Sequence, residues 1–305
     1  MEHRNGIWYG IAAYVVWGVS PLFWNLIDGI ATIDLLLHRA LWAVPMLALA
    51  ITMRRQWSTA RLAYASWKPR LATMAAAGLV AVNWGVYLWA VTHEQIVEAS
   101  LGYFINPLVS VALGVVVLGE RLRRLQWAAV VVAAFGVAYM AIRLGSLPWV
   151  SLALAGSFGL YGLLKKRADA PSPTVSLFGE VTTMALPALA ALVLTNPESD
   201  VAFGDSLSVS LFLISTGAIT VIPLLLFGAA AKRIPLSTIG LLQYIAPSLQ
   251  FLIGVAVYGE ALSNDRLIGF LFVWTALAMY TYDGVVRNSE SGIRSPESIG
   301  AREDG

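Results

Sequence analysis

Ten runs of apolar residues, each close to 20 residues long, constrain the fold of this chain more than any other feature. They fall roughly at 6–27, 32–53, 71–92, 97–118, 126–142, 147–164, 174–194, 208–231, 237–258 and 266–286. An α-helix of about 20 residues crosses the hydrocarbon core of a bilayer. Only 12% of the 305 residues are charged, about half the share in a soluble domain. The pattern predicts an all-α integral membrane protein with about ten transmembrane helices.

The two ends of the chain have different characters. The first apolar run follows a short basic start, but it is too long for a secretory signal and no small-residue cleavage site follows it. We therefore expect it to be the first transmembrane helix. Residues 289–305 are polar and poor in apolar side chains, so we expect a disordered cytoplasmic tail.

The basic residues gather in alternate connections between the apolar runs. If the N-terminus is cytoplasmic, 17 of the 20 Lys and Arg residues lie on the cytoplasmic side. Arg143 and Arg266 fall outside, and Arg39 lies within a helix. This asymmetry follows the positive-inside rule. It predicts an even number of helices with both termini in the cytoplasm.

Two segments 140 residues apart resemble each other. Residues 101–120 read LGYFINPLVSVALGVVVLGE and residues 241–260 read LLQYIAPSLQFLIGVAVYGE, with eight identities in twenty. The first copy ends the fourth helix and the second ends the ninth, so the two copies should run in opposite directions. We expect two inverted five-helix repeats, residues 1–143 and 144–288, an architecture that recurs in secondary transporters.

Several kinds of chemistry find no support in the sequence. The chain has no cysteine, which excludes disulfides and thiolate sites. Its histidines, His3, His38 and His93, show no ligand spacing, so we expect no metal site. No phosphate-binding loop GxxxxGK[ST] is present, and no serine–histidine–acid arrangement stands out. We expect no enzyme activity, no cofactor and no nucleic-acid partner.

His38, Arg39 and Glu180 are ionisable side chains that lie about two turns inside predicted membrane segments. A charge at the bilayer centre costs roughly 2.5–3.5 kcal/mol on insertion scales, so each should have a reason to be there. His38 and Glu180 each precede a proline by seven residues, at equivalent positions of the two repeats. We expect Arg39 to bind polar substrate atoms through its fork of donors, and His38 or Glu180 to exchange a proton. The alternative is a hydrogen-bond network that only fixes helix packing.

Polar-tipped and aromatic side chains gather on the third, fourth and ninth predicted helices. Such groups suit a pocket that binds an amphipathic organic molecule, although simple packing explains any one of them equally well. The candidates for this pocket are Asn83, Trp84, Tyr103, Asn106, Gln243 and Tyr244.

Five further residues are candidates for a gate or hinge. Glu98 begins the fourth helix, where the helix dipole alone favours a carboxylate. Glu120 and Glu260 end their helices, where the dipole is unfavourable, and a surface ion pair with a nearby arginine is the simpler interpretation of Glu120. Pro107 and Pro247 each remove a backbone hydrogen bond and can kink a helix.

Several longer motifs run through most of the chain. They are HRALW at 38–42, EASLGYFINPL at 98–108, GERLRRLQW at 119–127, GSLPW at 145–149, STIGLLQYIAPSLQFL at 237–252 and YGE at 258–260. With them the chain resembles the RarD family of the drug/metabolite transporter superfamily over residues 6–286. The resemblance implies two EamA-like halves, a bacterial inner membrane and export of a small organic compound, and the family name is tied to chloramphenicol. One position departs from the family pattern: its acidic residue usually stands six before the proline, where this chain has Val181, one step after Glu180.

The leading hypothesis is a secondary transporter that exports a drug such as chloramphenicol or an amino-acid-like metabolite by alternating access. Its partners would be a small organic solute and the lipid bilayer, with protons as one candidate coupling ion. A membrane channel, a non-transport membrane protein and a lipid-active membrane enzyme are the alternatives. The inverted repeat argues against a sensory protein, which has no need of it. Substrate, direction, coupling ion and oligomeric state are left open.

Overall fold

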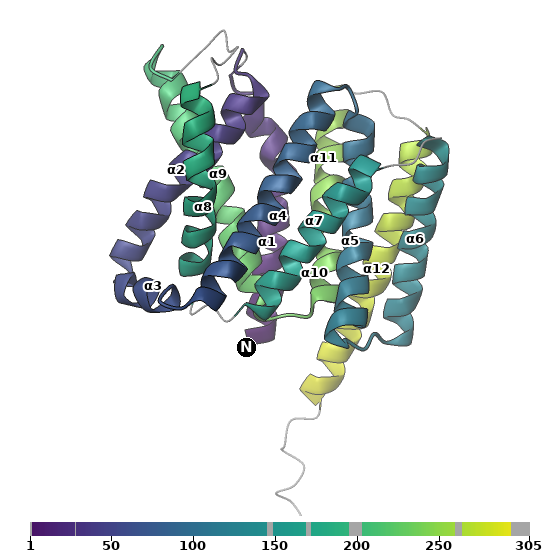
Figure 1. The fold of residues 1–305 in the computed structure, drawn as a ribbon. Coiled ribbons are helices and arrows are strands. Elements are labelled where there is room, and N and C mark those ends of the chain that lie inside the picture. The colour runs from purple at the N-terminus through teal and green to yellow at the C-terminus, as the bar shows by residue number, and fades with distance from the viewer. Residues whose placement is uncertain are drawn as a thin grey trace, which may run out of the picture.

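The computed structural model describes residues 2–27, 29–144, 149–168, 172–194, 203–259 and 264–293, and within these ranges the chain forms α-helices and no strand. Figure 1 shows the helices standing side by side. They are α1 (Glu2–Trp24), α2 (Thr32–Met53), α3 (Trp57–Ala63), α4 (Trp67–Thr92), α5 (Ile96–Leu118), α6 (Arg124–Leu144), α7 (Trp149–Arg167), α8 (Pro173–Leu194), α9 (Leu207–Ala231), α10 (Leu236–Leu242), α11 (Ile245–Ala256) and α12 (Asn264–Ile293).

The ten predicted segments correspond to ten long helical units, with α10 and α11 sharing one of them. Eight units are long and apolar enough to cross a membrane by length and composition. The other two are α7, and α12 with its shorter apolar stretch Leu267–Asp283. In α7, ten of the 19 residues are buried, so neighbouring helices rather than lipid cover much of its surface and its sequence can be more polar. The prediction of an all-α membrane protein with about ten helices is confirmed.

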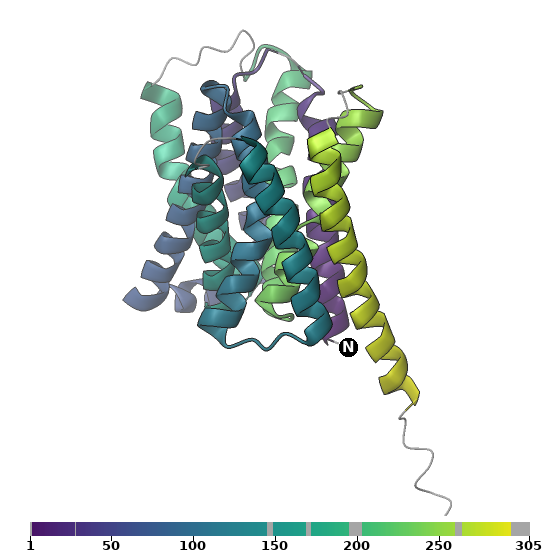
Figure 2. The same ribbon diagram turned by 90° about the vertical axis from the view of Figure 1, so that its right-hand side faces the viewer.

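Consecutive long units cross the bundle in alternate directions. As a result α1 begins, and α12 ends, at the same face of the molecule (Figures 1 and 2). We call this face the N-face and the other the opposite face. The short helix α3, which the sequence did not predict, lies at the N-face in the connection between α2 and α4.

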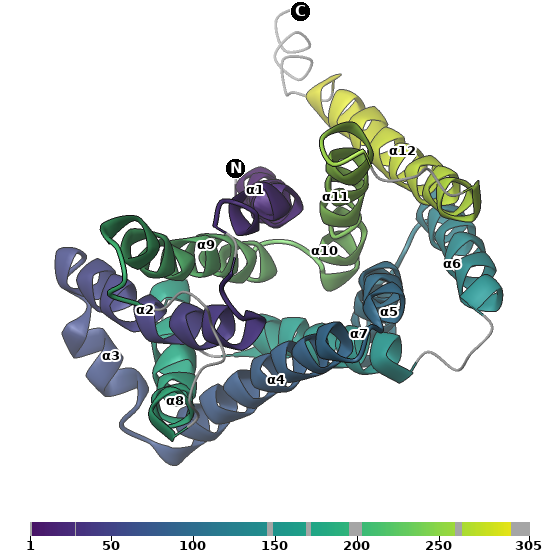
Figure 3. The same cartoon turned by 90° about the horizontal axis from the view of Figure 1, so that it is seen from above.

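The helix contacts repeat when the two halves of the chain are exchanged. The helix α5 packs on α7, and its counterpart α11 packs on α1; α2 packs on α9, and its counterpart α8 packs on α4. The pairs α6 with α12, α2 with α8 and α5 with α10 are unchanged by the exchange, and α1 on α9 corresponds to α7 on α4. Figure 3 shows this arrangement from above. Two inverted five-helix repeats produce this pattern, while the boundary between residues 143 and 144 stays a prediction.

The ninth helical unit, α10 with α11, is interrupted at a position where its counterpart, the fourth unit α5, is continuous. Pro247 has no N–H for the carbonyl of Gln243, four residues earlier, and that carbonyl accepts from Ala246 N instead, at 3.2 Å. A proline ring also clashes with the carbonyl four residues before it. The helix therefore divides at Gln243 and Tyr244 into α10 and α11. Pro107, the counterpart in α5, leaves that helix unbroken.

The helices α5 and α10 come into close contact at one glycine. A Cβ atom on Gly240 would lie 2.7 Å from the carbonyl oxygen of Pro107, a separation that real side chains do not show. Only glycine allows this approach, because it brings the backbone of α10 directly against α5. The contact places the interrupted unit beside the helix that carries Tyr103 and Asn106.

Candidate functional site

The guanidinium of Arg39 lies between two indole rings. Its Cζ atom is 4.4 Å from the centre of the Trp84 ring on α4 and 5.2 Å from that of Trp24 at the end of α1. Both distances fall within the range of cation–π attraction. Nε donates a hydrogen bond of 2.9 Å to Thr220 Oγ1 on α9. The side chain is thus positioned from three other helices.

The Thr220 hydroxyl accepts this bond through an oxygen lone pair and donates its own hydrogen elsewhere. Its hydroxyl donates to the carbonyl oxygen of Thr216 at 2.8 Å, one turn back along α9. The tyrosines Tyr87 and Tyr103 lie in the vicinity of Arg39, and their rings lie 6.4 Å apart. Aromatic and hydroxyl groups therefore surround the guanidinium.

The charge of Arg39 has no carboxylate partner among the residues that the structure describes. Within the same residues, the terminal nitrogens Nη1 and Nη2 make no hydrogen bond to protein. A guanidinium has five N–H donors in a planar fork, and here one of them is used. The remaining donors suit a carboxylate or another acceptor group of a bound molecule.

His38 lies next to Arg39 in sequence but has other neighbours. Its Nδ1 atom accepts a hydrogen bond of 3.1 Å from Trp42 Nε1. Its ring stacks on Phe203 at 5.7 Å, and Asp34 interacts with it electrostatically. Because the indole N–H is a donor, the neutral imidazole carries its hydrogen on Nε2.

Glu180 is held in a buried ion pair rather than beside Arg39. Lys165 Nζ on α7 lies 2.7 Å from Glu180 Oε1, and the two side chains are 4% and 3% exposed. Ser176 Oγ accepts from Lys165 Nζ at 2.8 Å and donates to Glu180 Oε1 at 2.7 Å. Tyr161 OH donates to Glu180 Oε2 at 3.0 Å. Each charge is therefore compensated and hydrogen-bonded.

A tyrosine in the connection between α3 and α4 closes the N-face side of this ion pair. Tyr64 OH donates to the carbonyl oxygen of Val175 at 2.8 Å, and a Cβ on Gly179 would overlap that hydroxyl. Burial raises the pKa of Tyr64, a bond with Thr73 lowers it, and the nearby Glu180 raises it again. The phenol stays protonated and remains a donor at neutral pH.

Of the other candidates for the pocket, some contact neighbouring helices and one is partly exposed. Asn83 Nδ2 donates to Leu154 O at 2.9 Å and to Ser157 Oγ at 3.0 Å, which ties α4 to α7. Tyr244 is fully buried, and its hydroxyl donates to Phe104 O at 3.3 Å. Tyr103 is 39% exposed although it stands two turns inside α5. These contacts favour packing roles for Asn83 and Tyr244.

Asn106 and Gln243 are both buried, at 8% and 5% exposure. Gln243 Nε2 donates to Ser110 Oγ at 3.1 Å. Ser110 stands one turn beyond Asn106 on α5, so the amide of the interrupted unit reaches the same part of α5. Gln243 therefore lies about one turn from Asn106 along α5, and among the described residues neither hydrogen-bonds to Arg39.

Glu120 caps the N-terminus of α10 at the N-face. Its Oε1 accepts from Leu236 N at 2.6 Å, and its Oε2 accepts from Ser237 N at 2.9 Å and Ser237 Oγ at 2.6 Å. The left-handed Gly119, with φ of 68°, turns the chain so that the carboxylate reaches α10. A surface ion pair was the simpler interpretation of Glu120. The structure instead places its carboxylate on the backbone of the other repeat.

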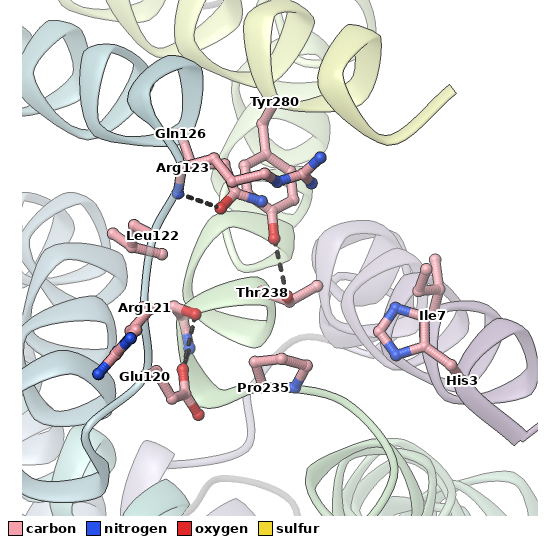
Figure 4. A pocket seen from close by; sticks show the side chains of 11 residues that line it. His3, Ile7, Glu120, Arg121, Leu122, Arg123, Gln126, Pro235, Thr238 and Tyr280 are labelled. Atoms are coloured by element: carbon pink, nitrogen blue, oxygen red, sulfur yellow. Dashed lines mark hydrogen bonds between the residues drawn. The ribbon is translucent and has the colours of Figure 1, made fainter. Parts of the chain in front are cut away.

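A cavity of about 390 Å³ adjoins this cap (Figure 4). It lies between α1, α10, α12 and the connection from α5 to α6, far along the bundle from Arg39. Thr238 and Tyr280 share a hydrogen bond of 2.7 Å in its wall, and Arg123 forms an ion pair with Asp283. Apart from Glu120, the cavity includes none of the predicted site residues. Its lining residues are His3, Ile7, Glu120, Arg121, Leu122, Arg123, Gln126, Pro235, Ser237, Thr238 and Tyr280.

The remaining gate and hinge candidates have local explanations or lie elsewhere. Glu98 stands in the first turn of α5, and its carbonyl accepts from Ser151 Oγ at 2.5 Å. Pro107 and Pro247 are described above, and Glu260 lies outside the described residues. Its neighbour Gly259 has φ of 66°, nearly the value of Gly119.

Sequence reasoning missed Trp24 and Thr220 beside Arg39. It also missed Lys165, Tyr161 and Ser176 beside Glu180. Trp24 and Thr220 carry no signal of their own, because an aromatic residue near a helix end and a threonine within a helix are common in membrane proteins. Lys165 belongs to a run of three basic residues that was assigned to a connection. Its i, i+4 spacing from Tyr161, matched by that of Ser176 and Glu180, was the available signal.

Comparisons with known proteins agree on one family. Residues 4–142 match the model of the EamA-like transporter family. The chain is 45% identical to "Protein RarD" of Streptomyces exfoliatus, over 93% of this chain and 90% of that protein. It is 37% identical to "Protein RarD" of Escherichia coli strain K12, over 93% and 96%. It is 31% identical to "Chloramphenicol-sensitive protein RarD" of Pseudomonas aeruginosa, over 92% and 94%.

A solved crystal structure shares the fold. It superposes with a TM-score of 0.72 at 22% identity, covering 92% of this chain and 98% of the other. The family resemblance drawn from the sequence motifs is confirmed by the relatives, which are matched over nearly their whole length. This multi-pass membrane chain belongs to the RarD family of the drug/metabolite transporter superfamily.

Proposed function

We propose that this protein is a secondary transporter that exports a small organic compound, a drug such as chloramphenicol or an amino-acid-like metabolite, by alternating access. The observation that carries the proposal is Arg39, whose charge lies inside a membrane helix with no carboxylate partner among the described residues. Such a charge is costly in a bilayer, and a bound acceptor group would offset that cost. The name of one relative, "Chloramphenicol-sensitive protein RarD", supports a drug as one class of substrate.

The surroundings of Arg39 suit an organic molecule with one polar end. The fork of the guanidinium binds the acceptor group, and the indole rings of Trp24 and Trp84 hold the fork in place and offer apolar surface. Tyr103, partly exposed beside them, contributes a hydroxyl. This combination selects compounds with an aromatic or aliphatic body and a carboxylate or similar group.

Alternating access is supported by the unequal shapes of the two repeats. Two related helical units, each with a proline at the same position, take different forms: α5 is continuous and α10–α11 is interrupted. Exchange of these forms between the repeats would open one side of the bundle and close the other. In the present form Glu120 ties α5 to α10 at the N-face, and we assign it the role of a gate residue.

We infer that the N-face is cytoplasmic and that the protein resides in a bacterial inner membrane. The basic residues of the sequence support this orientation through the positive-inside rule.

Coupling to protons would involve His38 or Glu180. Protonation of Glu180 must break its pair with Lys165, whereas protonation of His38 on Nδ1 would oppose the indole N–H of Trp42. Of the two, His38 needs the smaller rearrangement.

Comparative metabolite and drug profiling of a deletion strain and an overexpressing strain would identify substrates. Uptake into proteoliposomes then tests Arg39. We expect Arg39→Gln to lower uptake of an acceptor-bearing substrate by about tenfold to a hundredfold, the range for losing a hydrogen bond to a charged group. The control is Arg61→Gln, an exposed residue on α3.

Uptake by the Arg61→Gln control should remain normal. If transport is coupled to protons, uptake by the wild-type protein should change when a pH gradient is imposed across the vesicle membrane. Correctly folded, inserted Arg39→Gln protein with normal uptake of every substrate would contradict the proposed site. No substrate-dependent flux across a broad panel would contradict transport itself.

A further inference from the structure

The connection between α2 and α4 carries a concentration of positive charge at the N-face. The sequence has no Asp or Glu between Asp34 and Glu94, yet five basic residues lie within 54–70. We call residues 54–70, with α3 at their centre, the basic segment. Its basic side chains are all exposed, and they are Arg54, Arg55, Arg61, Lys68 and Arg70.

The basic segment also exposes large apolar side chains. Leu62 at the end of α3 is 77% exposed, and Trp67 at the start of α4 is 66% exposed. Figures 1 and 3 show α3 lying across the direction of the long helices, at the edge of the bundle. Basic groups beside exposed Leu and Trp are typical of a helix that lies in the headgroup region of a bilayer. We therefore place the basic segment against lipid headgroups rather than in bulk water.

Contacts with α8 hold the basic segment in place. The ring of Trp57 stands edge-on to that of Phe178, with the ring centres 5.6 Å apart. Tyr64 OH donates to the carbonyl oxygen of Val175 at 2.8 Å. Because these contacts fix α3 without any ligand, binding at its surface requires little further ordering of the chain.

Two of the basic side chains are already used within the protein. Arg54 Nη1 donates to Thr174 Oγ1 at 3.2 Å, which ties the end of α2 to α8. Arg70 Nε donates to the carbonyl oxygen of Tyr64 at 2.6 Å. These two arginines thus stabilise the segment itself.

The other three basic side chains are available to a ligand. Within the part of the chain that the structure describes, Arg55 and Arg61 form no hydrogen bond and no ion pair. Lys68 Nζ lies 5.9 Å from the centre of the Trp67 ring and makes no ion pair in the same residues. An arginine has five N–H donors and a lysine three. Exposed donors of one sign, with no acidic side chain nearby in sequence, suit an anion.

We propose that the basic segment is a binding surface for anionic phospholipids in the leaflet at the N-face, with headgroup phosphates paired to Arg55, Arg61 and Lys68. Guanidinium forks and ammonium groups both bind phosphate, and Leu62 and Trp67 enter the boundary between headgroups and acyl chains. Arg54 follows Arg39 by 15 residues, about 22 Å along α2. Lipid preference at this surface is therefore a property separate from substrate binding at Arg39.

A soluble acidic partner, such as an acidic protein segment, is the alternative occupant of the same charges. It would approach from the aqueous side and would leave Leu62 and Trp67 in water. Exposed apolar side chains favour the lipid. The depth of the segment relative to the bilayer separates the two occupants.

The test measures which lipid lies beside the segment in the purified full chain. The chain has no cysteine, so Ala65→Cys, an exposed position after α3, carries a single fluorophore. The protein is placed in phosphatidylcholine nanodiscs that contain nitroxide-labelled phosphatidylglycerol or nitroxide-labelled phosphatidylcholine. We expect the fluorophore to report at least about fivefold stronger association of phosphatidylglycerol, the factor that one basic residue at a membrane surface contributes. A fluorophore at Ser208→Cys, on the opposite face, should report no preference.

Reversing the charge of two available side chains, with Arg55→Glu and Lys68→Glu together, should lower the preference at residue 65 to about twofold or less. The matched control is Arg121→Glu with Arg124→Glu, which changes the net charge equally at two exposed positions in and after the connection from α5 to α6. It should leave the preference unchanged. In the wild type, 1 M NaCl shortens the screening length to about 3 Å and should also reduce the preference, a result that involves no variant and no change of fold.

Equal association of the two lipids at residue 65 of the wild type would overturn the proposal. A preference lost equally in the control pair would assign it to the overall charge of the protein and overturn the local surface. Absence of quenching by either lipid would place residue 65 in water, which excludes the lipid and favours a soluble acidic partner. A preference that is unchanged in 1 M NaCl would contradict its electrostatic origin.

Discussion

At the scale of single residues, Glu180 and Arg39 have opposite kinds of surroundings inside the bundle. The charge of Glu180 is compensated by Lys165 and receives further hydrogen bonds from Ser176 and Tyr161. Arg39 has aromatic faces and one threonine hydroxyl as its neighbours. A compensated pair fixes two helices together, whereas an uncompensated donor group is free to bind something that enters and leaves.

The buried pair gives the first prediction. Glu180→Gln keeps the shape but leaves Lys165 charged without its partner, and it should destabilise the protein by about 3–5 kcal/mol. The double variant Lys165→Met, Glu180→Met removes both charges and should lose much less stability than the single variant. Thermal unfolding in detergent, with Glu2→Gln on the exposed start of α1 as a control, measures both. Equal losses in the single and double variants would contradict this account of the pair.

Sequence reasoning found the two charged groups and, beside Arg39, Trp84 and Tyr103, but not the partners of Glu180. Arg39 and Glu180 stand out because charges are rare inside apolar runs. Lys165 stands at the end of such a run, beside two other basic residues, and its side chain packs against Gly228 of α9. Contacts of this kind, between residues far apart in sequence, cannot be derived from local pattern.

At the scale of elements, the same proline has different consequences in the two repeats. Pro247 accompanies a divided helix and Pro107 a continuous one. The sequence predicted a kink at both, since each removes one backbone bond. Both units are packed on neighbouring helices, α5 on α7 and α11 on α1, so the proline alone does not determine which unit divides. The position of the break, four residues before Pro247, follows from the clash of the proline ring.

The cap on α10 gives a prediction about opening at the N-face. Glu120→Gln removes the negative charge that accepts three hydrogen bonds from α10, and it should weaken closure by about 1–3 kcal/mol. The chain has no cysteine, so a single Ile7→Cys in the adjoining cavity reports access cleanly. We expect its labelling by a membrane-impermeant maleimide to rise severalfold in Glu120→Gln, and to stay unchanged in the control Glu2→Gln. Unchanged labelling in both would contradict a gate at Glu120.

At the scale of the whole molecule, the exchange of helix contacts between the two halves relates every major element to a partner of opposite direction. The apolar runs predicted the long helices closely, because the bilayer sets their length. Their lateral arrangement was not predictable from the sequence, since an apolar face against lipid and one against another helix have similar composition. The 140-residue repeat supplied the one long-range relation that the sequence contained.

Orientation gives a prediction at this scale. With the N-face in the cytoplasm, a cysteine at Glu2 should react with an impermeant maleimide only in inverted vesicles, and one at Gly204, on the connection that leads into α9, only in intact cells. The reverse pattern would contradict the assigned orientation.

Saturable counterflow in proteoliposomes tests the central claim of alternating access most directly. Vesicles loaded with unlabelled substrate should accumulate labelled substrate transiently from outside, with a rate that saturates, and Arg39→Gln should lower that rate at least tenfold. A flux that rises linearly with concentration and carries steady current, with no transient accumulation, would contradict alternating access and identify a channel.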